Sequence, residues 1–196
     1  MLNRDEDIMT SGQRHPFLAR WKVAVNKDGK LLALDADVFA NAGWSQDLSG
    51  AVVDRALSHS DGVYLIPNVH VRGRIVKTNT VSNTAFRGFG GPQGMFIAES
   101  YMEEIADRLH IPVERLREIN MYKPDEVTHF NQELKDWHVP LMYKQVKAES
   151  SYQARQQAVK DFNATHKWKK RGISLIPTKF GISYTVSLCP RLSLFP

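Results

Sequence analysis

The sequence contains little cysteine and no long apolar run, and each absence excludes a class of protein. Cys189 is the single cysteine among 196 residues, so this chain can form neither an internal disulfide framework nor a cysteine-ligated iron–sulfur cluster. No hydrophobic stretch approaches the length of a membrane span. The first residues are charged and lack an apolar h-region, so we expect no secretory signal and no membrane partner.

The residues that are present are typical of a globular protein, with 42% hydrophobic and 24% charged residues. The net charge of +5 permits an anionic partner but does not require one. The densest basic run, HKWKKRG at 166–172, places a tryptophan among cations, as some nucleic-acid surfaces do. No nucleic-acid-binding motif accompanies it, so we expect a solvated helix end and no nucleic-acid partner.

The hydrophobic pattern predicts an α+β fold with an N-terminal β-hairpin, short helices and mixed strands. Apolar residues alternate on both sides of the pair Asp28 and Gly29, which is typical of a hairpin turn. A helix capped by Ser49 is expected over 49–59, and a strand over 68–79. The order of elements does not alternate strand and helix, as a doubly wound parallel sheet would.

The second half is predicted to be mainly helical. Apolar residues at helical spacing from Ala98 to Leu109 predict a long helix. Pro112 suits the first turn of a second helix, and a third is expected from about Leu141. A final helix is expected after residue 149, and β-forming residues predict a strand over 171–186. Within these helices we expect three solvated glutamates, Glu99, Glu103 and Glu104. We also expect a capping box from Ser150 to Gln153 and burial of Tyr152, Val159 and Phe162.

The segment NTAFRGFGGPQGMF, residues 83–96, is rich in glycine but fits no standard nucleotide cradle. Glycines let backbone N–H groups approach a ligand, and the helix N-terminus that follows favours an anion or an electron-rich oxygen. An extended backbone would place Arg87 and Phe89 on one side, as a surface for a flat, polar ligand. The alternative is a tight turn with Phe86 and Phe89 in the core.

The longer segment KTNTVSNTAFRGFGGPQGM, residues 77–95, resembles the molybdenum-domain signature of the xanthine dehydrogenase/oxidase family, the molybdenum hydroxylases. Four further segments resemble the same family in the same order, so the resemblance covers roughly residues 4–186: RDEDIMTSGQRHPFLARWKV, QDLSGAVVDRALSHSDGVYLIPNVHVRGR, THFNQEL and WKKRGISLIPTKFGISYTV. It implies a partial molybdopterin-binding domain over 1–186 and a divergent tail over 187–196. The implied cofactor is molybdenum–molybdopterin, whereas FAD and 2Fe-2S clusters belong to other domains of the family.

The resemblance also implies a role for each candidate site residue. One set resembles the segment that contacts the cofactor, with Arg87 at the oxygen ligands of the metal: Phe86, Arg87, Gly88, Phe89 and Gly90. Phe89 resembles one of two aromatic residues that sandwich a purine, and Tyr184 takes the place of the second, where the family has phenylalanine. Thr185 resembles a residue that hydrogen-bonds near the substrate. Arg55 resembles the arginine that orients a purine through its oxygen, which aldehyde-oxidising members generally lack.

The implied activity is hydroxylation of hypoxanthine and xanthine to urate. The general-base glutamate of the family lies further downstream, and no carboxylate here matches it, so we expect the chain alone to be inactive and poorly stable. Two alternatives remain open: an aldehyde oxidase fragment, and a truncated product that binds a full-length subunit. The implied partners are a purine and the remainder of the domain, in a family that is typically homodimeric. The expected compartment is the cytoplasm, with the peroxisome left open, and the electron acceptor is either NAD or oxygen.

Overall fold

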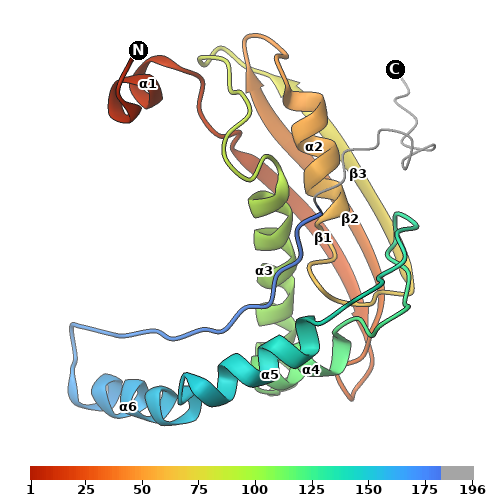
Figure 1. The fold of residues 1–196 in the computed structure, drawn as a ribbon, viewed down its shortest axis with the longest axis vertical. Helices are drawn as coiled ribbons and strands as arrows, with labels where there is room; N and C mark the ends of the chain where they lie inside the picture. Colours follow the sequence, from red (N-terminus) through yellow and green to blue (C-terminus); the bar gives the residue numbers. More distant parts are fainter. Residues whose placement is uncertain (182–196) are drawn as a thin grey trace.

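Three long strands form one mixed sheet in the computed structural model, which describes residues 1–181 (Figure 1). They are β1 (Phe17–Val25), β2 (Leu31–Gly43) and β3 (Asn68–Lys77), in the order β1-β2-β3. Strand β1 pairs antiparallel with β2, and β2 pairs parallel with β3. The predicted hairpin, the third strand and the α+β class are therefore confirmed.

The hairpin turn forms because its residues satisfy the backbone locally. The side chain of Asn26 accepts hydrogen bonds from the N–H groups of Asp28 at 3.1 Å and Lys30 at 2.8 Å. Gly29 has a φ of +86°, a left-handed conformation that glycine adopts without steric cost. The turn thus fixes the register that places one face of β2 in the core.

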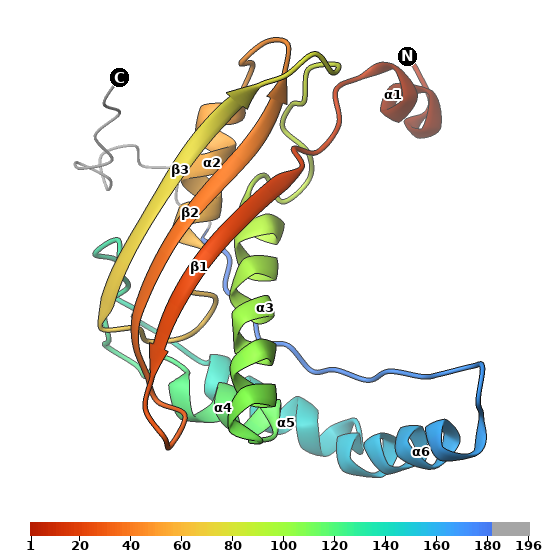
Figure 2. The ribbon, with the colours of Figure 1, turned by 180° about the vertical axis from the view of Figure 1, so that it is seen from behind.

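Two helices cover one face of the sheet, and no helix of residues 1–181 lies on the other face, as the view from behind shows (Figure 2). They are α2 (Ser49–Ser58) and α3 (Gly91–Leu109), and both were predicted. The predicted cap at Ser49 is wrong, because Leu48 is the N-cap and Ser49 lies inside the helix. The buried Ser49 hydroxyl instead lies 2.8 Å from Nε2 of His15, which ties the N-terminal segment to α2.

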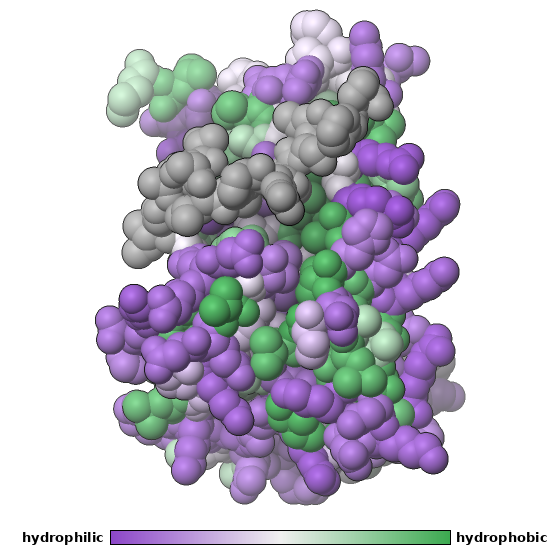
Figure 3. Space-filling view, turned by 90° about the vertical axis from the view of Figure 1, so that its right-hand side faces the viewer, coloured by the Kyte–Doolittle hydropathy of each residue, from purple (hydrophilic) through white to green (hydrophobic). Residues whose placement is uncertain are grey.

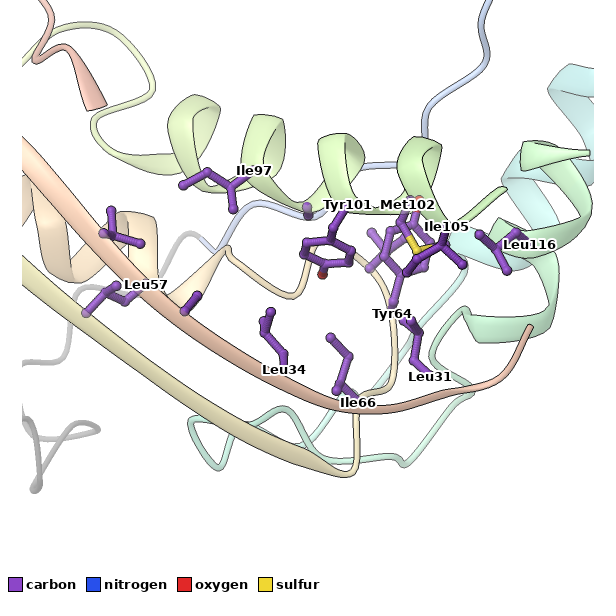
Figure 4. Packing of buried hydrophobic residues seen from close by; sticks show 14 of the residues in the cluster. Leu31, Leu34, Leu57, Tyr64, Ile66, Ile97, Tyr101, Met102, Ile105 and Leu116 are labelled. Atoms are coloured by element: carbon purple, nitrogen blue, oxygen red, sulfur yellow. The ribbon is translucent and has the colours of Figure 1, made fainter. Parts of the chain in front are cut away.

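The main core lies between the sheet and α3 (Figure 4). Tyr101 points from α3 toward Leu34 on β2, whereas Met102 lies beside Ile105 and Tyr64. Tyr101, Met102 and Leu34 are each no more than 1% exposed. Further members come from β2, α2, the segment after α2, α3 and α4 (Val113–Asn120): Leu31, Leu57, Tyr64, Ile66, Ile97, Ile105 and Leu116. This core holds α2 and the start of α3 in fixed positions beside the sheet.

A buried ion pair joins α3 to α4 (Val113–Asn120) and corrects one expectation. Arg117 is fully buried, and its Nε and Nη2 lie 2.8 and 2.7 Å from Oε2 of Glu99. The hydroxyl of Tyr64 donates to the other oxygen of Glu99 at 2.5 Å. Glu99 is therefore not solvated, because Arg117 and Tyr64 supply its partners inside the protein. Glu103 and Glu104 remain on the surface.

The remaining helices differ from the expectations mostly at their ends. Helix α5 (Val139–Glu149) matches the predicted one, whereas α1 (Arg4–Thr10) was not predicted. Helix α6 (Tyr152–Thr165) begins after Ser151, whose φ of 52° and lack of a side-chain cap rule out the predicted capping box. Only the first of the three residues expected to be buried in α6 is fully buried; the other two are half-buried: Tyr152, then Val159 and Phe162.

After α6, residues 166–181 return past α3 toward α2 (Figure 1). The strand predicted from residue 171 is wrong for the part that the structure describes, because 171–181 contain no strand.

The face in Figure 3 carries hydrophobic side chains among hydrophilic ones. Within residues 1–181, no helix has both the length and the apolar character needed to cross a membrane.

Candidate functional site

The glycine-rich segment forms a tight turn at Arg87–Gly90, directly before α3. The N–H of Phe89 donates to the carbonyl of Phe86 at 2.7 Å, and the N–H of Gly91 donates to that of Gly88 at 2.9 Å. Gly88 and Phe89 both have positive φ, at 88° and 57°. The backbone is therefore not extended, and the expectation that Arg87 and Phe89 share one side of a strand-like segment is wrong.

Helix packing explains part of the glycine content. A Cβ atom at Gly90 would lie 1.9 Å from the carbonyl oxygen of Val52 and 2.7 Å from the backbone nitrogen of Ala56. A Cβ atom at Gly94 would lie 2.3 Å from the carbonyl oxygen of Ala56. The start of α3 thus lies directly against the backbone of α2, an approach that only glycine permits.

The residues of the turn differ in how far they are exposed. Phe86 and Arg87 are exposed, whereas Phe89 is half-buried, so the two phenylalanines are not both core residues. In residues 1–181, no hydrogen-bond acceptor faces the backbone N–H groups of Gly88 and Gly90. Gly90 is itself buried, and an unpaired buried N–H is uncommon in proteins. The N–H of Arg87 has no acceptor in these residues either, so the turn has three N–H donors available to an external electron-rich group.

Arg55 on α2 contacts Phe180, a residue that the sequence analysis missed. Phe180 also lies against Gly91, which directly follows the turn. The guanidinium carbon of Arg55 lies 5.2 Å from the ring centroid of Phe180, and its Nη1 donates to the carbonyl of Gly181 at 3.3 Å. The ring of Phe180 lies 2.7 Å from where a Cβ of Gly91 would be. Phe180 therefore connects the predicted arginine to the glycine turn. The available signal for Phe180 was its position in WKKRGISLIPTKFGISYTV, the last of the segments that resemble the family.

His59 is a second residue that the sequence analysis missed. It is 3% exposed, its Nδ1 lies 2.8 Å from the carbonyl oxygen of Arg55, and its ring centroid is 5.2 Å from that of Phe180. Burial lowers the pKa of His59 to about 4, so the ring is neutral at pH 7. Because a carbonyl can only accept, Nδ1 carries the proton, and Nε2 is an acceptor without a partner in residues 1–181.

This histidine predicts a pH dependence of stability. The unfolded chain binds a proton at His59 near its ordinary pKa of 6.5, whereas the folded chain binds it only near pH 4. The free energy of unfolding should therefore fall as the pH drops from 6.5 to 4, by up to about 3 kcal/mol. Urea unfolding at several pH values measures this slope, and His59→Gln should reduce it. The slope that remains should come partly from His15, whose pKa burial also lowers. An unchanged slope in the variant would contradict the assignment.

A buried charged cluster fixes the segment that carries Phe180. Asp61 is fully buried and accepts hydrogen bonds from Nζ of Lys179 and from the hydroxyl of Tyr122, the latter at 2.9 Å. Nδ1 of His129 lies 3.5 Å from the same carboxylate. Burial raises the pKa of Asp61, but the charge of Lys179 and the contact with His129 outweigh that effect, so the pKa is lowered overall. This cluster holds the chain one residue before the ring that contacts Arg55. Tyr184 and Thr185 lie outside the described residues.

Comparison with known proteins identifies the family. Residues 1–121, more than half of the chain, match the model of the molybdopterin cofactor-binding domain. The chain belongs to the molybdopterin cofactor-binding domain family. The resemblance to the molybdenum hydroxylases is therefore confirmed, and both Arg55 and the glycine turn lie inside the matched residues.

Several members of this family are similar over nearly the whole chain. Xanthine dehydrogenase of Emericella nidulans is 70% identical over 185 residues, which is 94% of this chain and 14% of that protein. A nicotinate hydroxylase of the same organism is 57% identical over 96% of this chain and 14% of its own length. The aldehyde oxidoreductase of Desulfovibrio gigas matches with a TM-score of 0.70 and 34% identity, over 76% of this chain and 16% of that structure. The chain thus spans about one seventh of the relatives that it matches.

Proposed function

We propose that this chain forms the cofactor-facing turn and the substrate-orienting arginine of a molybdenum hydroxylase that converts hypoxanthine and xanthine to urate. The observation that carries the proposal is the position of Arg55, which Phe180 places beside the glycine turn. The 70% identity to a xanthine dehydrogenase supports the purine substrate. The proposed domain extends over residues 1–186. A homodimer in the cytoplasm is part of the proposal.

The residues of the turn fit a molybdenum–molybdopterin group. The exposed Arg87 is a permanently charged donor, and the N–H groups of Gly88 and Gly90 are donors without an acceptor in the part of the chain described. Such a donor set suits the oxygen ligands of a metal centre. When bound, the group supplies the oxidation–reduction chemistry of hydroxylation. FAD and 2Fe-2S clusters would be bound by other parts of the full-length polypeptide.

The substrate would stack on Phe89. Tyr184 and Thr185, which lie outside the described residues, are the proposed second aromatic residue and the proposed hydrogen-bonding residue. Stacking a base on an aromatic ring contributes about 1–3 kcal/mol and tolerates different bases. The guanidinium of Arg55 then selects among flat ligands, because it can meet a purine oxygen and the negative charge that develops on it. Phe180 and the carbonyl of Gly181 restrict the rotamers of Arg55 and so reduce the entropy lost on binding.

A chimeric enzyme tests this proposal. Residues 1–186 of this chain, the proposed domain, would replace the matching segment of the Emericella nidulans xanthine dehydrogenase, which is 70% identical over 94% of this chain. We expect molybdenum in the purified chimera and oxidation of both hypoxanthine and xanthine. Oxidation of aldehydes without oxidation of purines would favour the aldehyde oxidase alternative. A folded, flavin-containing chimera without molybdenum would contradict the proposal.

In this chimera, Arg55→Met should lower kcat/KM for xanthine by about 100- to 1000-fold, the usual effect of losing one donor to a developing oxyanion. Methionine keeps much of the apolar volume against Phe180 but cannot meet a purine oxygen. Steady-state kinetics measures the loss. Arg108→Met is the matched control, because Arg108 is exposed and, among the described residues, pairs only with Glu104. A loss of less than about threefold would show that Arg55 does not contact the reacting purine.

A further inference from the structure

Arg14, between α1 and β1, reaches the glycine turn from more than 70 residues away. Its Nη1 donates to the carbonyl oxygen of Phe89 at 3.0 Å and to Oε1 of Gln93 at 3.2 Å, and its Nη2 donates to the carbonyl oxygen of Arg87. Its guanidinium carbon also lies 4.9 Å from the ring centroid of Phe86. One side chain thus contacts both ends of the turn and the first turn of α3.

These contacts determine the direction in which the turn presents its donors. In a trans peptide, the carbonyl of one residue and the N–H of the next point in opposite directions, and residues 1–181 contain no cis peptide. Because Arg14 binds the carbonyl of Arg87, the N–H of Gly88 points away from it. Because Arg14 also binds the carbonyl of Phe89, the N–H of Gly90 likewise points away from Arg14. Neither of these two N–H groups has an acceptor in the described part of the chain.

We propose that Arg14 is a positioning residue that holds the Arg87–Gly90 turn so that the N–H groups of Gly88 and Gly90 face an anionic oxygen ligand. This inference rests on the proposed function, which makes that oxygen a ligand of the molybdenum centre. The turn needs such support because Phe89 has a φ of 57°, a conformation that a bulky side chain rarely adopts. The charged fork of arginine suits the task, because it can bind two carbonyl groups with a fixed geometry.

The test uses the chimeric enzyme with Arg14→Ala, Arg14→Lys and the control Arg20→Ala, which removes an exposed arginine from β1. The first readout is the molybdenum content per protomer, measured by mass spectrometry after gel filtration. The second is the thermal midpoint of the protein made in a host that lacks the cofactor. The third is kcat/KM for xanthine per bound molybdenum.

Arg14→Ala should lower the molybdenum content by about tenfold, as expected from losing charged hydrogen bonds that orient the donors. Arg14→Lys should recover part of it, because an ammonium group can still bind one carbonyl. The cofactor-free midpoint should stay within about 4 °C of the wild type, and the control should match the wild type in all three readouts.

Two results would overturn the proposal while leaving the proposed function intact. One is a full molybdenum content in Arg14→Ala with unchanged kcat/KM. The other is a loss of molybdenum in Arg14→Ala that is accompanied by a fall in the cofactor-free midpoint of clearly more than about 4 °C. Arg14 would then act only by stabilising the fold. A wild-type chimera that contains no molybdenum would overturn both proposals.

Discussion

Replacing Arg117 with leucine is expected to destabilise the chain by about 3–5 kcal/mol, the usual cost of removing one partner from a buried ion pair. The side chain of Arg117 is fully buried and binds Glu99 through two nitrogen atoms at 2.8 and 2.7 Å. Leucine would leave the carboxylate of Glu99 inside the protein with the hydroxyl of Tyr64 as its one hydrogen-bond partner within residues 1–181. The change would also remove the contact between Arg117 and the carbonyl of Leu175. Urea unfolding followed by circular dichroism measures the effect.

Two further variants separate the ion pair from simple loss of packing. Arg108→Leu removes an arginine from an exposed pair and should change stability by less than about 1 kcal/mol. The double variant Glu99→Leu with Arg117→Leu should be more stable than Arg117→Leu alone, because it leaves no buried charge without a partner. A loss of less than about 1 kcal/mol in Arg117→Leu alone would mean that water reaches the carboxylate of Glu99 in the variant.

The sequence predicted those parts of the fold that depend on local patterns. The hairpin follows from alternating apolar residues around Asp28 and Gly29, and α3 follows from apolar residues at helical spacing. The burial of Glu99 could not be predicted, because its partner Arg117 lies 18 residues away on another helix. The strand expected over 171–186 does not form in its described part, 171–181. β-forming residues make a strand only beside a free edge, and Lys179 instead holds this segment to Asp61 and Gly62, in the loop after α2.

The sequence likewise predicted only those parts of the candidate site that depend on local patterns. The glycine spacing predicted a turn before a helix, and Arg87 was identified on it. The roles of Arg55 and Phe89 required the family resemblance, because no periodicity connects residues on separate elements. Arg14 and Phe180 contact the site from distant parts of the chain, so only the folded arrangement reveals them. The glycines were interpreted as room for a ligand, whereas Gly90 and Gly94 also serve the contact between two helices.

This helix contact predicts that Gly90→Ala lowers the free energy of unfolding by about 3 kcal/mol or more, at the upper end of the effects of overpacking. The new methyl group would lie 1.9 Å from the carbonyl oxygen of Val52. Backbone atoms cannot rotate away as a side chain can, so α2 and the start of α3 must separate. Urea unfolding of the chain measures the loss. Gly50→Ala is the matched control, because Gly50 is a helical glycine of α2 whose nearest neighbours would be 3.9 Å away.

The two substitutions should change stability in opposite directions. Alanine is favoured over glycine inside a helix by about 0.5–1 kcal/mol, so Gly50→Ala should stabilise the chain. In the chimeric enzyme, Gly90→Ala should also lower the molybdenum content, because the shift that relieves the contact with Val52 moves the N–H of residue 90 and the attached turn. Normal stability and full molybdenum content in Gly90→Ala would show that α2 and α3 are further apart in solution. The glycine turn would then owe its shape to Arg14 and its own hydrogen bonds alone.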